Sequence, residues 1–355
     1  MSDAAATAPA GGPPGEHVVD ERASEVGLVV RLLRRPELGA LLAAFAVGLF
    51  FALTTDKFGT LDGAANWTDV ASTIGIVAVA VALLMIGGEF DLSAGVMTGT
   101  TGLLMGLLAT ELGFNIWLAI LCTFAFAAAV GLINGLMVVR TGVPSFIVTL
   151  GTFFVLQGVN LGVTKAITGQ VRVGGLSEAS GFESAQDIFG GTFWSPYDFR
   201  VSVLWWIAVT ALGAWILART RVGNWITAAG GDAGAARAVG VPVARVKVGL
   251  FVGTALAAAL VGVIVSLRLS SALASQGVGL EFFYIIAAVV GGCLLTGGFG
   301  SVIGASAGAL ILGMAFIGIP FEGWDTDWRF LFYGVTLLLA VLFNTAIRRR
   351  AEGAR

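Results

Sequence analysis

Long apolar runs with almost no charge recur along this chain, and they limit its fold more than any other feature. A helix needs about 20 mainly apolar residues to cross the hydrocarbon core of a bilayer. The sequence therefore predicts an all-α polytopic membrane protein with about ten transmembrane helices, the eighth short enough to be tilted, broken or re-entrant. The predicted spans are residues 38–54, 70–87, 92–110, 116–139, 146–163, 201–218, 248–267, 282–295, 302–319 and 330–346.

The composition explains why so much of the chain must face lipid. Hydrophobic residues make up 57% of the sequence and charged residues only 12%, against about 45–50% and about 25% in an ordinary soluble domain. So little charge cannot cover a water-facing surface of this size. The 51 glycines suit a helical membrane protein, because small residues let helices approach closely in lipid.

The placement of charges indicates how the spans are oriented. Cytoplasmic segments of membrane proteins carry an excess of Lys and Arg. If the first span runs outward, most of the 20 Lys and Arg residues fall on the cytoplasmic side. An even number of spans keeps the arginines at 348–350 on that side as well. Both termini are therefore predicted to be cytoplasmic.

The predicted organisation is one transmembrane domain, residues 37–347, with short tails. Residues 1–36 are rich in Ala, Gly and Pro and are predicted to be a disordered cytoplasmic tail, and 348–355 form a basic cytoplasmic tail. The longest segments outside the predicted spans are an extracytoplasmic loop at 164–200 and a cytoplasmic loop at 219–247. Neither loop is long enough to be a separate enzyme domain.

The segment 87–95 combines the glycine pair Gly87-Gly88 with two carboxylates. The glycines end one helix, and Asp91 or Ser93 is a natural N-cap for the next. A carboxylate at membrane depth costs about 2.5–3.5 kcal/mol, so Glu89 and Asp91 are expected at an interface or in a water-filled cavity. Two interpretations remain: a tight cytoplasmic turn with a capping Asp, or a broken helix whose start lines a pathway or gate.

Polar residues also lie along one face of the span at 146–163. Their helical spacing allows two roles, either hydrogen bonding between helices or a path for a hydroxylated substrate. Glu281 and Arg268 flank an outside turn, either as pathway or docking charges or simply at the membrane interface. The candidate residues for a substrate pathway or gate are Glu89, Asp91, Ser93, Thr149, Thr152, Gln157, Asn160 and Glu281.

The cytoplasmic loop contains the signature of a short capped helix. Asp232 follows Gly230 and Gly231 and can cap a helix that runs to about residue 239, and Gly240 can end it. Pro242 prevents its continuation. Two helical turns are not stable alone in water. The helix is therefore expected to dock against another surface, with a solvated turn as the alternative.

The chain lacks the usual signatures of an enzyme. The glycine-rich run at 291–301 could suggest a phosphate cradle, but a P-loop needs Gly-Lys-Ser/Thr, and none of the lysines is flanked that way. The single histidine, His17, lies in the N-terminal tail, which leaves no His-based metal site or catalysis in the membrane part. We expect no catalytic residue, metal or cofactor in this chain, and we expect these glycines to serve close helix packing.

Four segments, taken together and in this order, resemble a known family. They are Gly-Gly-x-x-Asp-Leu-Ser at 87–93, Val-Pro-Ser-Phe-Ile-Val-Thr-Leu-Gly-Thr at 143–152, Gly-Gly-Asp-x-x-Ala-Ala-Arg-x-x-Gly-Val at 230–241, and the two glycine-rich runs within 286–304. The chain resembles the permease subunits of ribose/xylose-type sugar ABC importers, the binding-protein-dependent transport system inner membrane component family. The resemblance covers about residues 70–347.

The resemblance implies partners as well as a function. It implies a multi-pass inner-membrane permease that moves a simple sugar or polyol, pairs with a second copy as a homodimer, and receives the sugar from an extracytoplasmic binding protein. A cytoplasmic ATPase would bind ATP and Mg²⁺, so the chain itself would not be an enzyme; no nucleic acid is implied. The residues implied to contact the ATPase as a coupling element are Gly230, Gly231, Asp232, Ala236, Arg237 and Gly240.

The chain departs from the family pattern at three positions that bear on substrate. Glu89 is an extra residue in the usual Gly-Gly-x-Asp-Leu-Ser, Gln157 stands where many relatives have Arg, and Glu281-Phe-Phe-Tyr replaces a pattern with a second acidic group. Permeases for nucleosides or branched-chain amino acids are the nearest alternatives. A stand-alone secondary transporter is the rival from another class, although such proteins usually need an ionisable relay inside the membrane.

Overall fold

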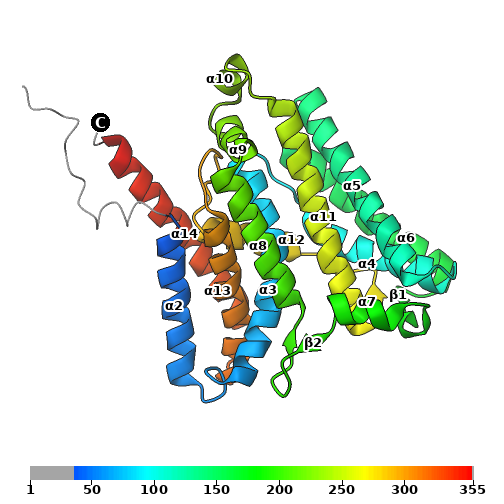
Figure 1. Cartoon of the computed structure of the whole chain (residues 1–355). Coiled ribbons are helices and arrows are strands. Elements are labelled where there is room, and N and C mark those ends of the chain that lie inside the picture. The colour runs from blue at the N-terminus through cyan, green and yellow to red at the C-terminus, as the bar shows by residue number, and fades with distance from the viewer. Residues whose placement is uncertain (1–35, 354–355) are drawn as a thin grey trace, which may run out of the picture. The chain divides into compact units, whose positions relative to one another are not determined.

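The computed structural model describes residues 36–353 and is built almost entirely of helices (Figure 1). All of the predicted tail at 1–36 except Pro36 lies outside the described residues, as does His17. The helices are α2 (Pro36–Thr54), α3 (Leu61–Ile86), α4 (Ala94–Thr110), α5 (Ile116–Thr141), α6 (Ser145–Thr168), α7 (Phe182–Phe189), α8 (Ser202–Arg219), α9 (Arg221–Gly231), α10 (Ala233–Ala238), α11 (Val243–Leu269), α12 (Leu280–Val290), α13 (Val302–Phe321) and α14 (Trp328–Gly353).

Short strands and one 3₁₀ turn occur only in the connections of the described chain. The strands are β1 (Arg172–Val173), β2 (Thr192–Phe193), β3 (Phe199–Arg200) and β4 (Ala272–Leu273), and the 3₁₀ turn is η2 (Leu176–Glu178). Strand β1 pairs antiparallel with β4, and β2 pairs antiparallel with β3. Most of these elements lie in the predicted loop at 164–200, so this loop is structured.

The predicted membrane fold is confirmed in its class. Within the described residues, 7 helices are long and apolar enough to cross a bilayer: α2, α3, α5, α6, α8, α11 and α13. The shorter apolar helices are α4, α12 and the part of α14 up to Leu342. Every predicted span overlaps one of these helices, so the chain is an all-α polytopic membrane protein. The count of about ten spans stays a prediction.

Several helices extend beyond the predicted spans, and α3, α11 and α14 are the clearest examples. Helix α3 begins at Leu61 rather than at 70, because the Thr60 hydroxyl accepts a hydrogen bond from the amide of Gly63 and caps the helix. Helix α11 begins at Val243, directly after Pro242. Helix α14 continues to Gly353, so the predicted tail at 348–355 is helical up to that residue. Polar ends of these helices lie outside the apolar windows that defined the predictions.

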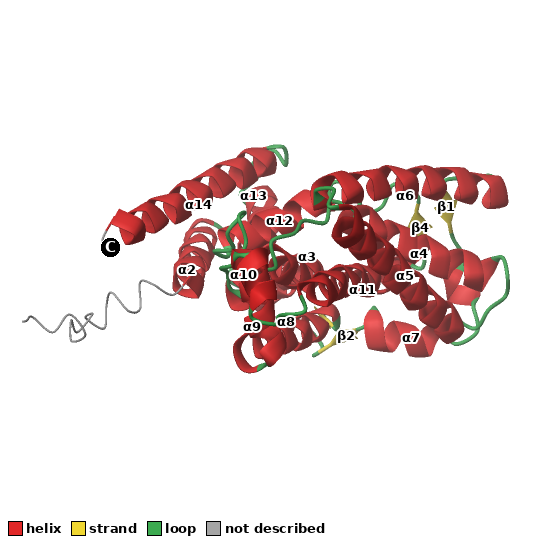
Figure 2. Ribbon diagram, turned by 90° about the horizontal axis from the view of Figure 1, so that it is seen from above, coloured by secondary structure: helices red, strands yellow, loops and turns green. Residues whose placement is uncertain are grey.

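Helices α3, α11 and α13 form the centre of the bundle, and α2, α6 and α8 expose most of their apolar residues. Figure 2 shows α3 and α11 inside the bundle, with α6 and α8 on opposite sides of it. Helices that are apolar all round are typical of a buried position, and an exposed apolar face suits contact with lipid. Segments α7 and β2 lie at one end of the bundle and α9 and α10 at the other (Figure 1).

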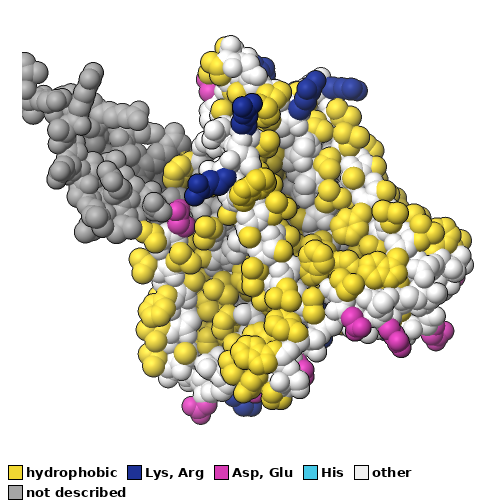
Figure 3. Space-filling model, viewed as in Figure 1, with side chains coloured by type: hydrophobic (Ala, Val, Ile, Leu, Met, Phe, Trp, Pro, Cys, Tyr) yellow, Lys and Arg dark blue, Asp and Glu magenta, His cyan; other side chains and the backbone are white. Residues whose placement is uncertain are grey.

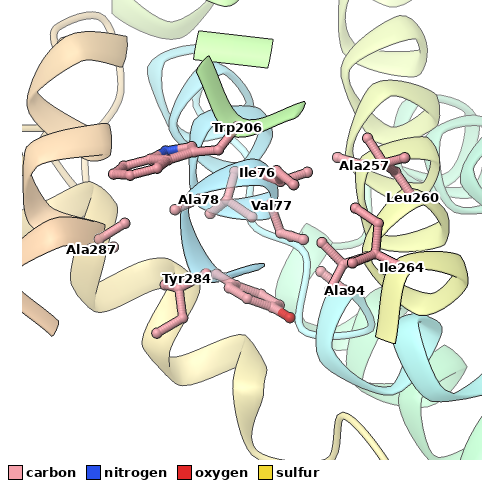
Figure 4. Close-up of a cluster of buried hydrophobic side chains, with 14 of the residues drawn as sticks. Ile76, Val77, Ala78, Ala94, Trp206, Ala257, Leu260, Ile264, Tyr284 and Ala287 are labelled. Atoms are coloured by element: carbon pink, nitrogen blue, oxygen red, sulfur yellow. The ribbon is translucent and has the colours of Figure 1, made fainter. Parts of the chain in front are cut away.

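The core between the central helices consists of small and branched side chains. In Figure 4, Ile76, Val77 and Ala78 of α3 lie between Trp206 of α8 on one side and α11 on the other. Tyr284 of α12 reaches toward the start of α4 in the same view. All of these side chains are buried. Helix α3 therefore packs against neighbours on every side.

Glycines at the helix crossings allow very close contact. A Cβ atom on Gly308 of α13 would lie 2.1 Å from the carbonyl oxygen of Ala287 in α12, and one on Gly262 of α11 would lie 2.4 Å from the carbonyl oxygen of Thr98 in α4. Neither distance leaves room for a side chain. The predicted role of glycine in close helix packing is confirmed at these crossings.

We predict that Gly308→Ala destabilises the protein by about 1–3 kcal/mol, because the added methyl group overpacks the α12–α13 contact. The matched control is Gly158→Ala in α6, where no atom lies within 4 Å of an added Cβ. Thermal unfolding of both purified variants in detergent checks this. Equal unfolding midpoints for the two variants would contradict the packing argument.

Candidate coupling and pathway site

The predicted short helix in the cytoplasmic loop exists as α10. The Asp232 carboxylate accepts hydrogen bonds from the amides of Gly234 and Ala235, at 2.8 and 2.9 Å. These two bonds hold the pKa of Asp232 below its usual value, because they stabilise the ionised form. Gly240 follows the helix with a φ of +88°, which favours glycine. The predicted cap and stop are therefore both confirmed.

One side of α10 faces the protein and the other faces outward. Ala236 is buried, whereas Arg237 is exposed and Val239 is 80% exposed. Helix α10 forms the tip of the molecule at its end of the bundle (Figure 1). Val239 was missed by the sequence reasoning, and its apolar neighbours in the loop give no local signal for its exposure. Together these residues form a small basic and apolar knob.

Helix α9, which the sequence did not predict, connects α10 to the bundle. The hydroxyl of Thr220 caps it by accepting a hydrogen bond from the amide of Gly223, at 3.2 Å. Ile226 and Ala229 are buried against the rest of the protein. Helix α9 is therefore anchored in the core along its length, and it ends at the glycine pair that precedes α10.

Three glycine-rich segments that lie far apart in the sequence meet at one point. A Cβ atom on Gly230 would lie 1.8 Å from the carbonyl oxygen of Ile86, and one on Gly297 would lie 2.7 Å from the Cα atom of Gly88. The amide of Gly298 donates a hydrogen bond to the carbonyl of Ile86 at 2.8 Å. We call Gly88, Gly230, Gly297 and Gly298 the glycine junction.

The glycine junction brings backbone directly against backbone. Gly88, Gly297 and Gly298 have φ values of +82, +79 and +76°, which side chains rarely adopt. Gly231 differs from its neighbour Gly230, because the nearest atom to an added Cβ lies 4.0 Å away. The end of α3, the end of α9 and the segment between α12 and α13 are therefore in contact without intervening side chains.

Glu89 forms an ion pair with Lys247 in the first turns of α11. The side chains are only 10% and 17% exposed. A buried charge is stable when it is paired and hydrogen-bonded. The ion pair therefore accounts for the burial of Glu89, which the sequence had predicted to lie at an interface or in a water-filled cavity.

Asp91 holds the turn before α4. Its Oδ1 atom accepts hydrogen bonds from the amide and the hydroxyl of Ser93, at 2.8 and 2.6 Å. Ser93 occupies the N-cap position of α4, but its side chain makes no capping bond. Asp91 is buried, so the segment is not a solvated turn. The structure therefore shows a break between α3 and α4 that lies inside the protein.

Hydroxyl groups of α6 satisfy the backbone of this break. Ser145 Oγ accepts a hydrogen bond from the amide of Phe90, and Thr149 Oγ1 accepts one from the amide of Leu92, both at 3.0 Å. Irregular backbone at membrane depth needs such partners, because lipid offers none. The position of Ser145 beside the break has no local signal in the sequence.

Two further polar residues of α6, Thr152 and Asn160, bond to neighbouring helices. Thr152 donates to Asn134 Oδ1 at 2.6 Å, and Asn134 Nδ2 donates to Ser93 Oγ at 3.1 Å. Asn160 donates to the Thr100 hydroxyl at 3.0 Å. These contacts support the hydrogen-bonding interpretation for Thr149, Thr152 and Asn160. Gln157 is half-buried and lies outside this network.

Glu281 lies deeper than the surface turn predicted for it. It is 4% exposed, and a Cβ atom on Gly95 at the start of α4 would lie 2.0 Å from its Oε2 atom. Gly106, further along α4, packs against β1, which belongs to the loop at 164–200. Since a helix rises 1.5 Å per residue, Gly95 and the Glu281 carboxylate beside it lie about 16 Å along α4 from this loop. Arg268 instead pairs with Asp69 of α3, at 2.6 Å. The starts of α4 and α12 therefore meet inside the bundle.

Comparison with known proteins decides the class. The family model described as "Branched-chain amino acid transport system / permease component" matches residues 63–341. The chain belongs to this family. It is therefore a multi-pass membrane permease component, which confirms the predicted class, and it is not an enzyme.

Curated relatives cover nearly the whole chain. The probable ABC transporter permease protein YphD of Escherichia coli (strain K12) is 33% identical over 90% of this chain and 92% of its own length. The xylose transport system permease protein XylH of the same strain is 30% identical over 87% of this chain and 91% of its own length. The ribose import permease protein RbsC of the same strain is 31% identical over 88% of this chain and 94% of its own length. No solved structure matches the chain.

We predict that Lys247→Met lowers the free energy of unfolding by about 3–5 kcal/mol, because it leaves the Glu89 carboxylate buried without a partner. The double variant Lys247→Met with Glu89→Met should recover most of this loss, since no unpaired charge remains. Thermal unfolding of the two variants and the parent protein measures the difference. A double variant no more stable than the single one would contradict a buried, paired role.

Proposed function

We propose that this chain is the membrane-spanning permease subunit of an ATP-driven importer for a simple sugar or polyol, such as a pentose, a hexose or an inositol-like compound. An extracytoplasmic binding protein delivers the substrate, a cytoplasmic ATPase binds ATP and Mg²⁺, and a second copy of the chain completes a homodimer. Support for the substrate class comes from the relatives named for xylose and ribose. The chain itself carries no cofactor in this proposal.

The observation that carries the proposal is the position of α10. A capped helix of six residues is too short to persist alone in water, yet it stands at the tip of the molecule with Arg237 and Val239 exposed. Such a knob suits insertion into a groove of a partner. Gly230, Gly231, Asp232, Ala236, Arg237 and Gly240 are the proposed coupling residues.

The glycine junction gives the force on α10 a route into the membrane. A push on α10 reaches α9 at Gly230, and Gly230 contacts the end of α3 and the segment before α13. These are the places where the helices are broken. Broken helices near the bilayer midplane form the substrate sites of many secondary transporters. Closure of the ATPase would therefore reorient both breaks together.

The proposed pathway or gate lies around the start of α4. Asp91, Ser93 and Glu281 are buried there, and Glu89, Thr149, Thr152, Gln157 and Asn160 extend the polar set. Few of these groups are charged and few aromatic side chains join them. We therefore expect the pathway to bind sugar weakly, and the affinity to reside in the binding protein.

The proposed orientation places α10 and both termini in the cytoplasm. Helix α2 begins, and α14 ends, toward the end of the bundle that carries α10 (Figure 1). Lys and Arg side chains gather at this end in Figure 3, and acidic side chains are more common at the other. That distribution agrees with the excess of basic residues in cytoplasmic segments.

Two other transport functions are alternatives to this proposal, and one uptake experiment distinguishes them. The description of the family names branched-chain amino acids, so a permease for these or for nucleosides is the nearest one. A stand-alone secondary transporter is the other. Uptake of labelled D-ribose, D-xylose, myo-inositol, leucine and adenosine in proteoliposomes, with and without the ATPase and the binding protein, separates all three.

We predict that Arg237→Glu lowers ATP-driven sugar uptake about ten-fold or more, the loss typical of an exposed Arg at the centre of an interface. Arg140→Glu at the exposed end of α5 is the control and should leave uptake unchanged. Uptake driven by an ion gradient in the absence of the ATPase, or normal ATP-driven uptake by Arg237→Glu, would contradict the proposal.

A further inference from the structure

An apolar groove lies between α8, α9 and α11, with α3 as its floor. Its volume is about 670 Å³. Val79 and Leu83 of α3, Leu212 of α8 and Leu260 of α11 are among the residues that line it. No part of the transport mechanism proposed above uses this groove.

The groove opens on the surface of the bundle that faces lipid. Leu212 is 55% exposed and Val222 is 44% exposed, although both are apolar and line the groove. On α11, Gly249 and Gly253 line it as well, and no atom lies within 4 Å of a Cβ added to either. Figure 3 shows mainly hydrophobic side chains over α8 and α11 on this face.

The length of the groove matches the thickness of one leaflet of the bilayer. Along α11 it runs from Arg245 to Leu260, which is about 22 Å at 1.5 Å per residue. One leaflet, including its headgroup region, is about 20–22 Å thick. The groove has a volume of about 670 Å³ over this length.

Charge marks one end of the groove. Among the described residues that line it, Arg245 alone is charged, and it lies at the α10 end together with Trp225 and Pro242. Arg219 and Arg221, where α8 meets α9, are exposed at the same end of α8. Tryptophan and arginine at the depth of the headgroups are typical of a membrane interface, and arginine pairs well with phosphate.

We propose that this groove binds one anionic glycerophospholipid. An acyl chain lies against α3, α8 and α11, and the phosphate contacts Arg245. The lipid bridges α8 and α11 beside the start of α9, the helix that leads to α10. This proposal does not depend on the transported substrate.

The test uses the full chain in phosphatidylcholine vesicles that contain either a photoreactive phosphatidylglycerol or a photoreactive phosphatidylcholine. Peptide mapping then measures labelling of α8 and α11. We expect the phosphatidylglycerol probe to label the groove more strongly. Arg245→Gln should reduce that labelling about five-fold, the factor that corresponds to one cation near an anionic surface, with no effect on the phosphatidylcholine probe.

Gly253→Leu should abolish labelling in the groove, because its side chain fills the open space above α11. Gly158→Leu in α6 is the matched control, because Gly158 is also an open glycine but lies away from the groove, and it should label as the parent does. Equal labelling by the two probes in the parent protein would overturn the proposal. So would unchanged labelling of Gly253→Leu, or a disulfide between two copies through Leu256→Cys, which would place a second copy in the groove.

Discussion

Direct contact between three stretches of backbone is the constraint on which the rest of this structure depends. At Gly230 there is no space for even one carbon atom, because the carbonyl of Ile86 and the amide of Gly298 occupy it. A contact made by side chains can yield through changes of rotamer, but a contact between backbones moves as one piece. The part of the chain proposed to meet the ATPase is therefore tied to both helix breaks.

The polar contacts around the break between α3 and α4 follow from the same constraint. A helix that stops inside the membrane leaves amides and carbonyls without partners. Ser145 and Thr149 supply acceptors for two of these amides, Asp91 serves the amide of Ser93, and Lys247 ties Glu89 to α11. The break is thus rigid locally, which favours motion as a unit over local unfolding.

The sequence predicts the features that have a local cause. Apolar runs predict the spans, and Asp232 and Gly240 predict both ends of α10, because capping and chain reversal depend on neighbouring residues. It does not predict that Gly88, Gly230 and Gly298 meet, that Ser145 serves the break, or that Glu281 lies inside the bundle. Those facts depend on how distant segments pack, and no local pattern records them. Helix α9 does have a local signal, apolar residues at helical spacing (Val222, Trp225, Ile226 and Ala229), which the sequence analysis missed.

The most direct measurement compares Gly230→Ala with Gly334→Ala in α14, where an added Cβ meets no described atom within 4 Å. ATP hydrolysis and sugar uptake are measured in the same proteoliposomes, after gel filtration has shown that both variants assemble with the ATPase. The account predicts that Gly334→Ala keeps both activities, whereas Gly230→Ala hydrolyses ATP but loses most uptake. The same uptake per ATP in the two variants would contradict it.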